Sequence, residues 1–410
     1  MKGGFELNRD QDVVIVDAVR TPFGKFGGVL KDISSIDLGV HVVRQLLERT
    51  GIQAVEIDEI IHGTAMLAEA GMSTNIPARQ ILLKAGLEPS TLSLTIDRAC
   101  CSSMTAIQMG YRSIRSGEAD AVIALGADNM SRVPHLLPGL RWGKKLGEAP
   151  LLDILFELGY KDWAPVACDA GTAAVAFNVS REAQDEWAYR SQMRYQRAKA
   201  DGFFDNHVVP VAYSLKTGGD PQYLLADEFP KPHTTFEGLS KLPVIYGSPT
   251  VTAGNSPGLD TGAAGLLLMS RTKAERLSLK PPAALIGISS VADSPENIAM
   301  VPGYAIAKLM KKLNLALPDI SLFEINEAFA AVPLVSSLIL SDGDESRRRY
   351  LEEHLNVNGG AIAVGHPVGA SGARIAMTMM YELIRRGGGV GMAAICGGLA
   401  QGDGLAIKVE

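Results

Sequence analysis

The stretch Asn358-Gly359-Gly360-Ala361-Ile362-Ala363-Val364-Gly365-His366-Pro367-Val368-Gly369-Ala370-Ser371-Gly372-Ala373-Arg374 places five glycines around a single histidine. Glycine permits a positive φ and the close approach of other groups, and Pro367 stiffens the turn after the histidine. Apolar residues then recur at helical spacing, at Ile375, Met379 and Leu383. The pattern predicts a strand, a tight loop carrying His366, and a helix whose free N–H groups point toward the same place. Taken alone, the histidine is better explained by packing; the glycine density and three further polar clusters favour catalysis.

The composition is that of an ordinary globular protein. The chain has 410 residues, 47% of them hydrophobic and 20% charged, a length that suits two or three packed units. A net charge of −6 gives no electrostatic reason to expect nucleic acid as a partner. No continuous apolar run is long enough to span a bilayer, and residues 1–6 lack the apolar segment of a secretory signal. We therefore expect a cytoplasmic protein without membrane contact.

The cysteines point to chemistry or packing. There are four of them, and none forms a C-x-x-C pair: Cys100, Cys101, Cys168 and Cys396. This spacing is neither a disulfide framework nor a zinc site, so no metal is expected. It suits a reducing cytoplasm, where a cysteine is either a packing residue or a nucleophile.

The order of predicted elements repeats along the chain. The first half reads as a strand near Ile60, a strand–turn–helix around Cys100, and a strand that begins at Ala121. The second half reads as a strand over 322–325, the strand–turn–helix around His366, and a strand over 390–395. The repeat predicts an α/β protein made of two similar halves, with helices between sheets.

A block of different character separates the halves. It is rich in proline, glycine and basic residues near its start and contains a helix pattern over 180–201 with Ser180 as its N-cap. Its arginines and lysines are either solvated, the default for each, or placed to meet ligand phosphates. We expect a first half formed by residues 11–128 with 247–272, an inserted loop domain at 129–246, and a second half at 273–410.

Four polar groups follow predicted strands, where α/β folds place their sites. They are Cys100, Asn326 with its neighbouring glutamate, His366, and Cys396 with the glycines after it. Each has a structural explanation when taken alone, since buried cysteines pack and Asn–Glu pairs cap helices. A helix N-terminus beside Cys100 is expected to lower the pKa of its thiol.

At these residues the chain resembles the thiolase family of acetyl-CoA acyltransferases over nearly its whole length. The resemblance rests on residues 19–28, the Cys100 turn, residues 326–330 (Asn-Glu-Ala-Phe-Ala), residues 365–367 (Gly-His-Pro) and Cys396 with its glycines; residues 250–255 fit as well. It implies a layered α-β-α-β-α core plus the inserted loop domain. It also implies 3-oxoacyl-CoA as substrate and coenzyme A as co-substrate, with no bound cofactor.

The resemblance assigns roles residue by residue. Cys100 attacks the 3-keto carbon and carries the acyl group, while His366 takes protons from Cys100 and later from the CoA thiol. Cys396 exchanges a proton with the acetyl-CoA carbanion, or removes the α-proton in the condensing direction. Asn326, through a water, and His366 stabilise the enolate oxygen, and the backbone N–H groups of Cys100 and Gly398 form a second oxyanion hole.

Several positions depart from the family pattern. Cys101 and Ser103 stand where glycines are usual, Val166-Ala167 replaces a Met-Gly pair, and Leu399-Ala400 interrupts the last glycine run. The CoA-contacting serine aligns with Pro257, one place after Ser256. The residues expected to bind substrate or CoA are Ser256, Pro257, Val166, Phe329 and Ala253. From these departures we expect either an unusual acyl group, as in fatty acid or aromatic acid metabolism, or altered docking of CoA. An additional small subunit that assists CoA binding is one explanation of altered docking.

Partners and rival classes complete the expectation. The resemblance implies a homodimer or homotetramer, formed through the nucleophile-bearing half, with residues 130–147 similar to the part that pairs dimers. One rival class is a ketosynthase of the same fold, which pairs its cysteine with two histidines or with histidine and asparagine. The presence of Cys396 and of the Asn326 motif favours a thiolase over a ketosynthase. A non-catalytic, acyl-CoA-binding subunit that depends on a partner is the alternative function.

Overall fold

The computed structural model describes residues 12–71, 75–157, 162–214 and 220–410. Residue 11, at which the first half was expected to begin, and the N-terminal residues examined for a targeting signal lie outside the described part. Within the described ranges, no helix is both long and apolar enough to cross a membrane.

Strands from both halves of the chain form one hydrogen-bonded series in the order β11-β12-β13-β10-β1-β9-β4-β2-β3. Its centre is narrow: β1 and β10 pair only through Val14 with Ala284 and Ile15 with Ala283. The strands of the first half are β1 (Val13–Arg20), β2 (Glu59–Gly63), β3 (Leu92–Ile96), β4 (Ala121–Asn129) and β9 (Thr261–Ser270). Those of the second are β10 (Ala283–Ala292), β11 (Leu322–Ile325), β12 (Gly389–Gly397) and β13 (Gln401–Val409).

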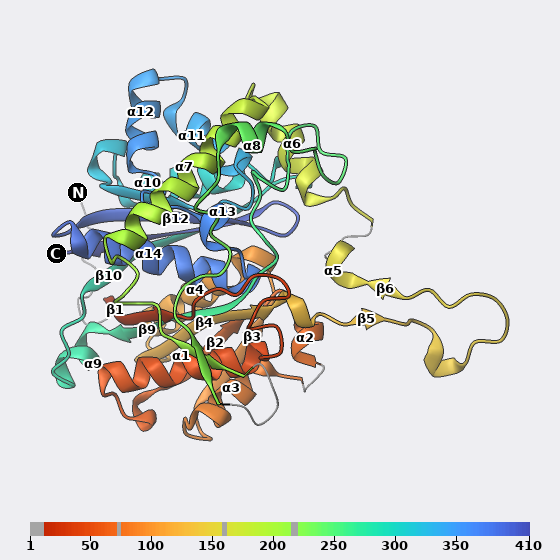
Figure 1. Cartoon of the computed structure of the whole chain (residues 1–410). Coiled ribbons are helices and arrows are strands. Elements are labelled where there is room, and N and C mark those ends of the chain that lie inside the picture. The colour runs from red at the N-terminus through yellow and green to blue at the C-terminus, as the bar shows by residue number, and fades with distance from the viewer. Residues whose placement is uncertain (1–11, 72–74, 158–161, 215–219) are drawn as a thin grey trace.

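Two helices, α4 (Ser102–Ser116) and α14 (Ser371–Arg385), lie between the two sheet halves (Figure 1). Gln108 on α4 donates to the carbonyls of Ser289 and Gly404 in the second half at 2.8 and 3.2 Å. The two helices approach closely, because a Cβ on Gly372 would lie 2.5 Å from the backbone nitrogen of Met104. Buried residues of both sheet halves and both helices form one apolar cluster.

Outer helices complete the layers. The face of the first half is covered by α1 (Ser35–Thr50), α2 (Leu67–Gly71), α3 (Pro77–Ala85) and α9 (Arg271–Arg276). The face of the second half is covered by α10 (Val301–Leu313), α11 (Ala331–Ser341) and α12 (Glu345–His354). The expected α-β-α-β-α layering is confirmed.

The internal repeat is also confirmed by strand order. The order β1-β9-β4-β2-β3 in the first half corresponds to β10-β13-β12-β11 in the second. The counterpart of β3 is reduced to one parallel bridge between Phe323 and Leu355. The strand–turn–helix units that carry Cys100 and His366 therefore occupy equivalent places in the two halves.

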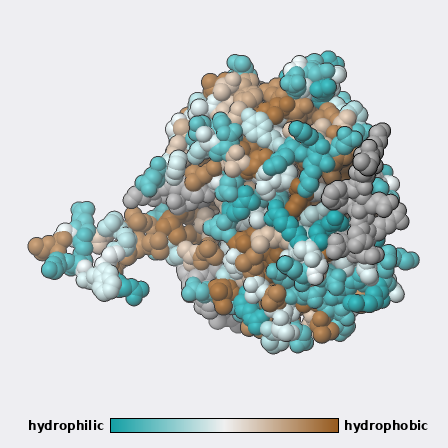
Figure 2. Space-filling model, turned by 180° about the vertical axis from the view of Figure 1, so that it is seen from behind, coloured by the Kyte–Doolittle hydropathy of each residue, from teal (hydrophilic) through white to brown (hydrophobic). Residues whose placement is uncertain are grey.

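The chain between β4 and β9 lies outside the sheet. It contains β5 (His135–Leu136), β6 (Leu152–Asp153), α5 (Ile154–Glu157), α6 (Val166–Ala176), α7 (Arg181–Ala200), β7 (Val211–Tyr213), β8 (Gln222–Leu224) and α8 (Phe236–Ser240). Ser180 caps α7 as expected, accepting from the Ala183 N–H. Residues 135–153, here called the arm, project away from the body (Figures 1 and 2). The division into three domains remains an interpretation.

One element differs from the sequence prediction near His366. The chain before it forms a single helical turn, α13 (Ala361–Val364), instead of a strand. Ser191 Oγ accepts from the Gly360 N–H and Glu327 Oε2 accepts from the Ile362 N–H. Because these side chains bind the backbone donors, no neighbouring strand is needed to satisfy them.

The turn after β12 holds two non-glycine residues in the left-handed region. Leu399 has φ of 54° and Ala400 has φ of 55°. A side chain at such a φ brings its Cβ too close to the following carbonyl, a strain of about 1–2 kcal/mol per residue. The broken glycine run therefore places strain directly beside Cys396 and Gly398.

Comparing Leu399→Gly with Leu399→Ala isolates this strain, because both variants lose the leucine side chain beyond Cβ and differ only in the Cβ itself. We expect the glycine variant to be the more stable of the two by about 1 kcal/mol, which reverses the usual order. Urea unfolding curves measure the difference. A glycine variant less stable than the alanine variant would show that the turn carries no such strain.

Candidate active site

Cys100 and His366 meet between the two halves of the molecule. Cys100 lies in the 3₁₀ turn Ala99–Cys101 that leads into α4, and His366 lies in the loop before α14. The distance from His366 Nε2 to Cys100 Sγ is 3.3 Å. The cysteine is half-buried and the histidine is buried. A thiol and an imidazole from opposite halves thus stand within proton-transfer distance.

Ser371 fixes which imidazole nitrogen of His366 carries the proton. Its hydroxyl donates to the Pro367 carbonyl at 3.0 Å and lies 2.6 Å from His366 Nδ1. Since the single hydroxyl proton is used by the carbonyl, the Ser371 oxygen accepts from Nδ1–H. The unprotonated Nε2 therefore faces Cys100 and is able to accept its proton.

The electrostatics keep this pair neutral. Burial, the neighbouring Cys396, and the carboxylates of Asp128 and Asp97 raise the pKa of the Cys100 thiol well above its usual value. Burial, together with the Arg374 charge, lowers the pKa of His366 to about 3. The sequence-based expectation of a lowered thiol pKa is therefore wrong, because burial and nearby negative groups outweigh the helix N-terminus. Cys100 needs a base to become nucleophilic.

Two carboxylates of the first half hold the His366 loop by its backbone. Asp260, just before β9, accepts from the His366 N–H at 2.7 Å. Asp128, near the end of β4, accepts from the Gly369 N–H at 2.5 Å and from Thr64 Oγ1 at 2.7 Å. Burial raises the pKa of each carboxyl to about 7. These contacts set the position of the histidine relative to the cysteine.

Asn326 and Glu327 follow β11 and play different structural parts. Glu327 is fully buried and accepts four hydrogen bonds, from Trp187 Nε1, Ser191 Oγ, Asn356 Nδ2 and the Ile362 N–H. Glu327 therefore joins α7 to the histidine loop as a structural group.

Asn326 is also fully buried, and its Oδ1 accepts from Arg374 Nη2 at 3.0 Å. Its Nδ2 has no partner among the described residues.

Cys396 and Gly398 lie at the end of β12. Cys396 is buried, which raises the pKa of its thiol to about 12, and it lies close enough to act electrostatically on Cys100. Cys101 is fully buried, with its Sγ 3.4 Å from the Ile395 carbonyl. A Cβ on Gly397 would lie 2.7 Å from that sulfur, so Cys101 occupies packing space that Gly397 leaves.

The residues expected to bind substrate or CoA lie at the start of α6, after β11 and in the loop before β9. Val166 begins α6, and it and Phe329 are half-buried against the same apolar cluster. Ser256 is buried and donates to the Thr252 carbonyl at 2.6 Å, next to the half-buried Pro257. Ala253 is exposed. The structure brings Phe329 next to the loop that carries Ala253, Ser256 and Pro257, since the Ala330 N–H donates to the Asn255 carbonyl at 2.9 Å.

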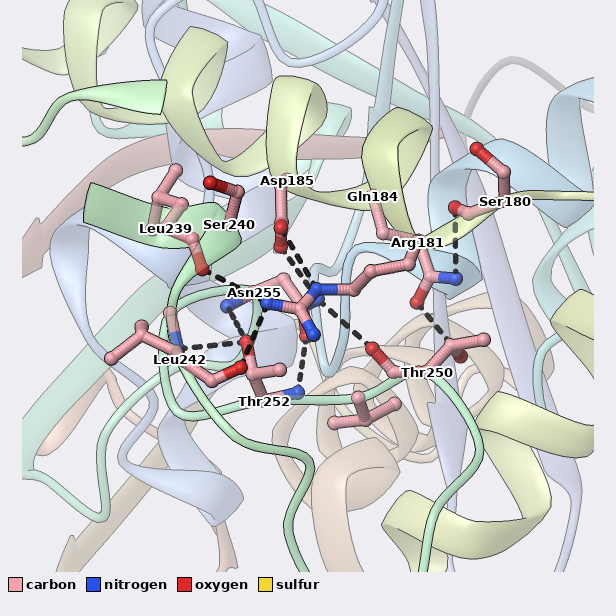
Figure 3. Close-up of polar contacts among 12 residues, drawn as sticks. Ser180, Arg181, Gln184, Asp185, Leu239, Ser240, Leu242, Thr250, Thr252 and Asn255 are labelled. Atoms are coloured by element: carbon pink, nitrogen blue, oxygen red, sulfur yellow. Dashed lines mark hydrogen bonds and ion pairs between the residues drawn. The ribbon is translucent and has the colours of Figure 1, made fainter. Parts of the chain in front are cut away.

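A polar network fixes the loop that carries Ala253 and Ser256 (Figure 3). On α7, Asp185 accepts from Arg181 Nε at 2.8 Å and from Asn255 Nδ2 at 3.0 Å. Asn255 Oδ1 in turn accepts from the Thr252 N–H at 2.8 Å. Arg181 also donates to the carbonyls of Leu239 and Leu242. The loop is thereby attached to α7.

Sequence reasoning missed the residues that support the site: Ser371, Asp128, Asp260 and Arg374. A weak signal existed for two of them. Asp128 follows a buried strand, and Ser371 stands five residues after His366 at a helix start. Asp260 and Arg374 act through contacts between distant segments, which spacing along the chain does not reveal.

Comparisons with known proteins identify the family of the chain. The family described as "Thiolase, N-terminal domain" matches residues 13–272, and "Thiolase, C-terminal domain" matches residues 279–409. The acetyl-CoA acetyltransferase of Chromobacterium violaceum is 40% identical, covering 97% of this chain and 99% of that protein. A probable acetyl-CoA acetyltransferase of Escherichia coli is 38% identical, covering 98% and 99%.

Solved structures give the same result. A crystal structure of the Bacillus anthracis acetyl-CoA acetyltransferase superposes with a TM-score of 0.90 at 34% identity, covering 97% of this chain and 99% of that one. Human mitochondrial 3-ketoacyl-CoA thiolase in complex with CoA superposes with a TM-score of 0.87 at 32% identity, covering 97% and 98%.

A cysteine and a histidine lie within proton-transfer distance between the two sheet halves, and the matched relatives are acyltransferases. The chain belongs to the thiolase family, and it is an acyl-transferring enzyme. The alternative of a non-catalytic subunit is not favoured, since the named relatives are acetyltransferases.

Acid should destabilise the fold through His366. The ring has a pKa of about 3 in the folded protein and about 6.5 when unfolded, so the unfolded chain binds more protons below pH of about 6.5. The stability that the neutral ring provides is present above this pH and is lost as the pH falls toward 3.

We therefore expect wild type to lose about 2 kcal/mol more unfolding free energy than His366→Asn between pH 7.5 and pH 5. Chemical denaturation at the two pH values measures this. The control is His233→Asn, at an exposed histidine, whose loss should leave the pH dependence as in wild type. Equal slopes for wild type and His366→Asn would contradict a buried neutral ring.

Proposed function

We propose that the protein cleaves a 3-oxoacyl-CoA with coenzyme A, or catalyses the reverse Claisen condensation, through an acyl-enzyme on Cys100. The observation that carries the proposal is the 3.3 Å approach of His366 Nε2 to Cys100 Sγ. The neutral pair supports a mechanism in which His366 removes the thiol proton as the sulfur attacks.

In the first half-reaction, Cys100 loses its proton to His366 and its sulfur bonds to the 3-keto carbon. The bond between C2 and C3 breaks, and the electron pair goes to acetyl-CoA as an enolate. Cys396 gives this enolate a proton at C2, and the histidine's proton restores Cys396. The raised pKa of Cys396, about 12, suits a group that must hold a proton until the enolate forms.

In the second half-reaction, the CoA thiol loses its proton to His366 and attacks the acyl group on Cys100. The carbon–sulfur bond to Cys100 breaks, and the departing sulfur takes the proton from His366. Acyl-CoA leaves and both cysteines return to the thiol form. The charge balance closes without a metal or redox cofactor, with CoA as co-substrate.

Two oxyanion sites serve these steps in the proposal. The backbone N–H groups of Cys100 and Gly398 stabilise the tetrahedral intermediate on Cys100. Asn326, through a water, and His366 stabilise the enolate oxygen. The unpartnered Nδ2 of the fully buried Asn326 supports this, because a buried donor needs an acceptor and none of the described residues supplies one.

An apolar cluster beside the nucleophile bears on the acyl group. Cys100 packs against the buried side chains of Met66, Met130, Leu155 and Val368. Because these apolar side chains pack next to the nucleophile, we propose a short, unbranched acyl group. The bulkier groups predicted from the substitutions are the other outcome of the test.

Intact-protein mass spectrometry tests both points. Wild type mixed with acetyl-CoA, acetoacetyl-CoA and branched or aromatic 3-oxoacyl-CoAs should gain the mass of a short acyl group, and Cys100→Ala should gain none. Cys101→Ala is the matched control and should still be acylated. Absence of any adduct on wild type would contradict the proposal, and an aromatic or branched adduct would contradict the short-acyl part.

Compartment and assembly belong to the same proposal. The chemistry requires two reduced thiols, which supports the cytoplasm. The arm supports a homo-oligomer, a dimer or tetramer, because it exposes apolar side chains that a monomer would leave in water, including Trp142 at 88% and Leu146 at 92%. A second copy is the proposed partner; turnover by the purified chain would exclude a requirement for an additional small subunit.

Removing the apolar side chains of the arm should reduce the assembly. We expect Leu140→Ser/Trp142→Ser/Leu146→Ser to have about half the mass of wild type in light scattering after size exclusion, since apolar contacts drive association. The control, Lys144→Ser/Lys145→Ser, changes the same loop but keeps its leucine and tryptophan side chains, and it should keep the wild-type mass. Equal masses for all three proteins would exclude the arm as an assembly contact.

A further inference from the structure

Arg374 is buried beside the site and is not used by the mechanism above. It is the fourth residue of α14 and is 1% exposed. Its Nη2 donates to Asn326 Oδ1 at 3.0 Å. Its Nε and Nη1 have no hydrogen-bond partner among the described residues. The Asn326 amide therefore receives the hydrogen bond that the guanidinium makes.

The contact determines which way the Asn326 amide faces. An amide presents an acceptor on one side and two donors on the other, and the two orientations have nearly the same shape. A guanidinium only donates, so the atom facing Arg374 is the Asn326 oxygen. Nδ2 is thereby directed away from Arg374 as a donor, and it is the amide atom without a protein partner.

A purely structural ion pair explains Arg374 less well. Its carboxylate neighbour, Glu324, is fully buried, yet the distance from Nη1 to Oε2 is 3.7 Å and neither carboxylate oxygen accepts a hydrogen bond from the described residues. Compare Arg20, whose two terminal nitrogens lie 2.6 and 2.9 Å from the two oxygens of Asp227. Arg20 has the bidentate geometry of a structural pair, and Arg374 does not.

We propose that Arg374 is a positioning residue, whose guanidinium holds the Asn326 amide with its N–H donors toward the water or enolate oxygen of the substrate. The inference rests on the proposed function, in which Asn326 serves the enolate. Without Arg374, the amide is free to rotate and present its oxygen, which repels an enolate oxygen instead of stabilising it.

The two partial reactions separate this role from a structural one. Formation of the acetyl-enzyme from acetyl-CoA uses Cys100, His366 and the backbone oxyanion hole, and no enolate forms. Condensation to acetoacetyl-CoA adds the enolate step. A residue that positions Asn326 should matter for condensation and hardly at all for acetyl-enzyme formation.

We expect Arg374→Met to form the acetyl-enzyme at a rate within about threefold of wild type and to lose about 10- to 100-fold in kcat for condensation, with KM nearly unchanged. Rapid-quench mass spectrometry measures the first rate, and acetoacetyl-CoA absorbance measures the second. Arg374→Lys should recover only part of the loss, because an ammonium lacks the planar fork. Arg20→Met is the structural control and should slow both reactions by similar factors.

Glu324 would be left as an unpaired buried carboxyl in Arg374→Met, so the double variant Arg374→Met/Glu324→Gln is measured alongside it. It should show the same selective loss of condensation. Equal losses in the two partial reactions, or no loss in either, would overturn the positioning role. Failure of wild type to form an acetyl-enzyme would instead overturn the proposed function, and the inference with it.

Discussion

Two buried carboxylates of the first half, Asp128 and Asp260, hold the backbone of a loop that belongs to the second half. The sheet halves themselves meet only through the short pairing of β1 with β10, so strand hydrogen bonding cannot fix the site. The carboxylates bind the N–H groups of Gly369 and His366 at 2.5 and 2.7 Å. The alignment of the imidazole with Cys100 depends on these bonds and on the packing of α4 against α14.

Burial of the site also determines the protonation states of Cys100 and His366. It raises the pKa of Cys100 and lowers that of His366, so the resting pair is uncharged. A neutral thiol next to a neutral base becomes nucleophilic only as its proton moves to that base. Ser371 holds the imidazole proton on Nδ1, so that the unprotonated Nε2 is the nitrogen that accepts the proton of Cys100.

The residues that depart from the family pattern contact packed backbone and side chains rather than the candidate catalytic groups. Cys101 occupies space against Gly397, and Ser103 accepts a hydrogen bond from the Ala373 N–H at 2.9 Å. Leu399 and Ala400 remain in a conformation that favours glycine. Substitutions that looked like changes of substrate are therefore partly changes in how the two central helices and the last hairpin fit together.

The sequence by itself determined the α/β class, the repeat of two halves and the family, because period, strand-end motifs and glycine turns are local patterns. It also predicted the four candidate catalytic residues through the family resemblance, and their roles await the tests above. Tertiary structure alone decided what no local pattern encodes: the neutral state of Cys100, the clamp by Asp128 and Asp260, and the contact of Arg374 with Asn326. Each of these arises from burial or from side chains more than 40 residues apart, and desolvation and long-range contacts exist only once the chain has folded.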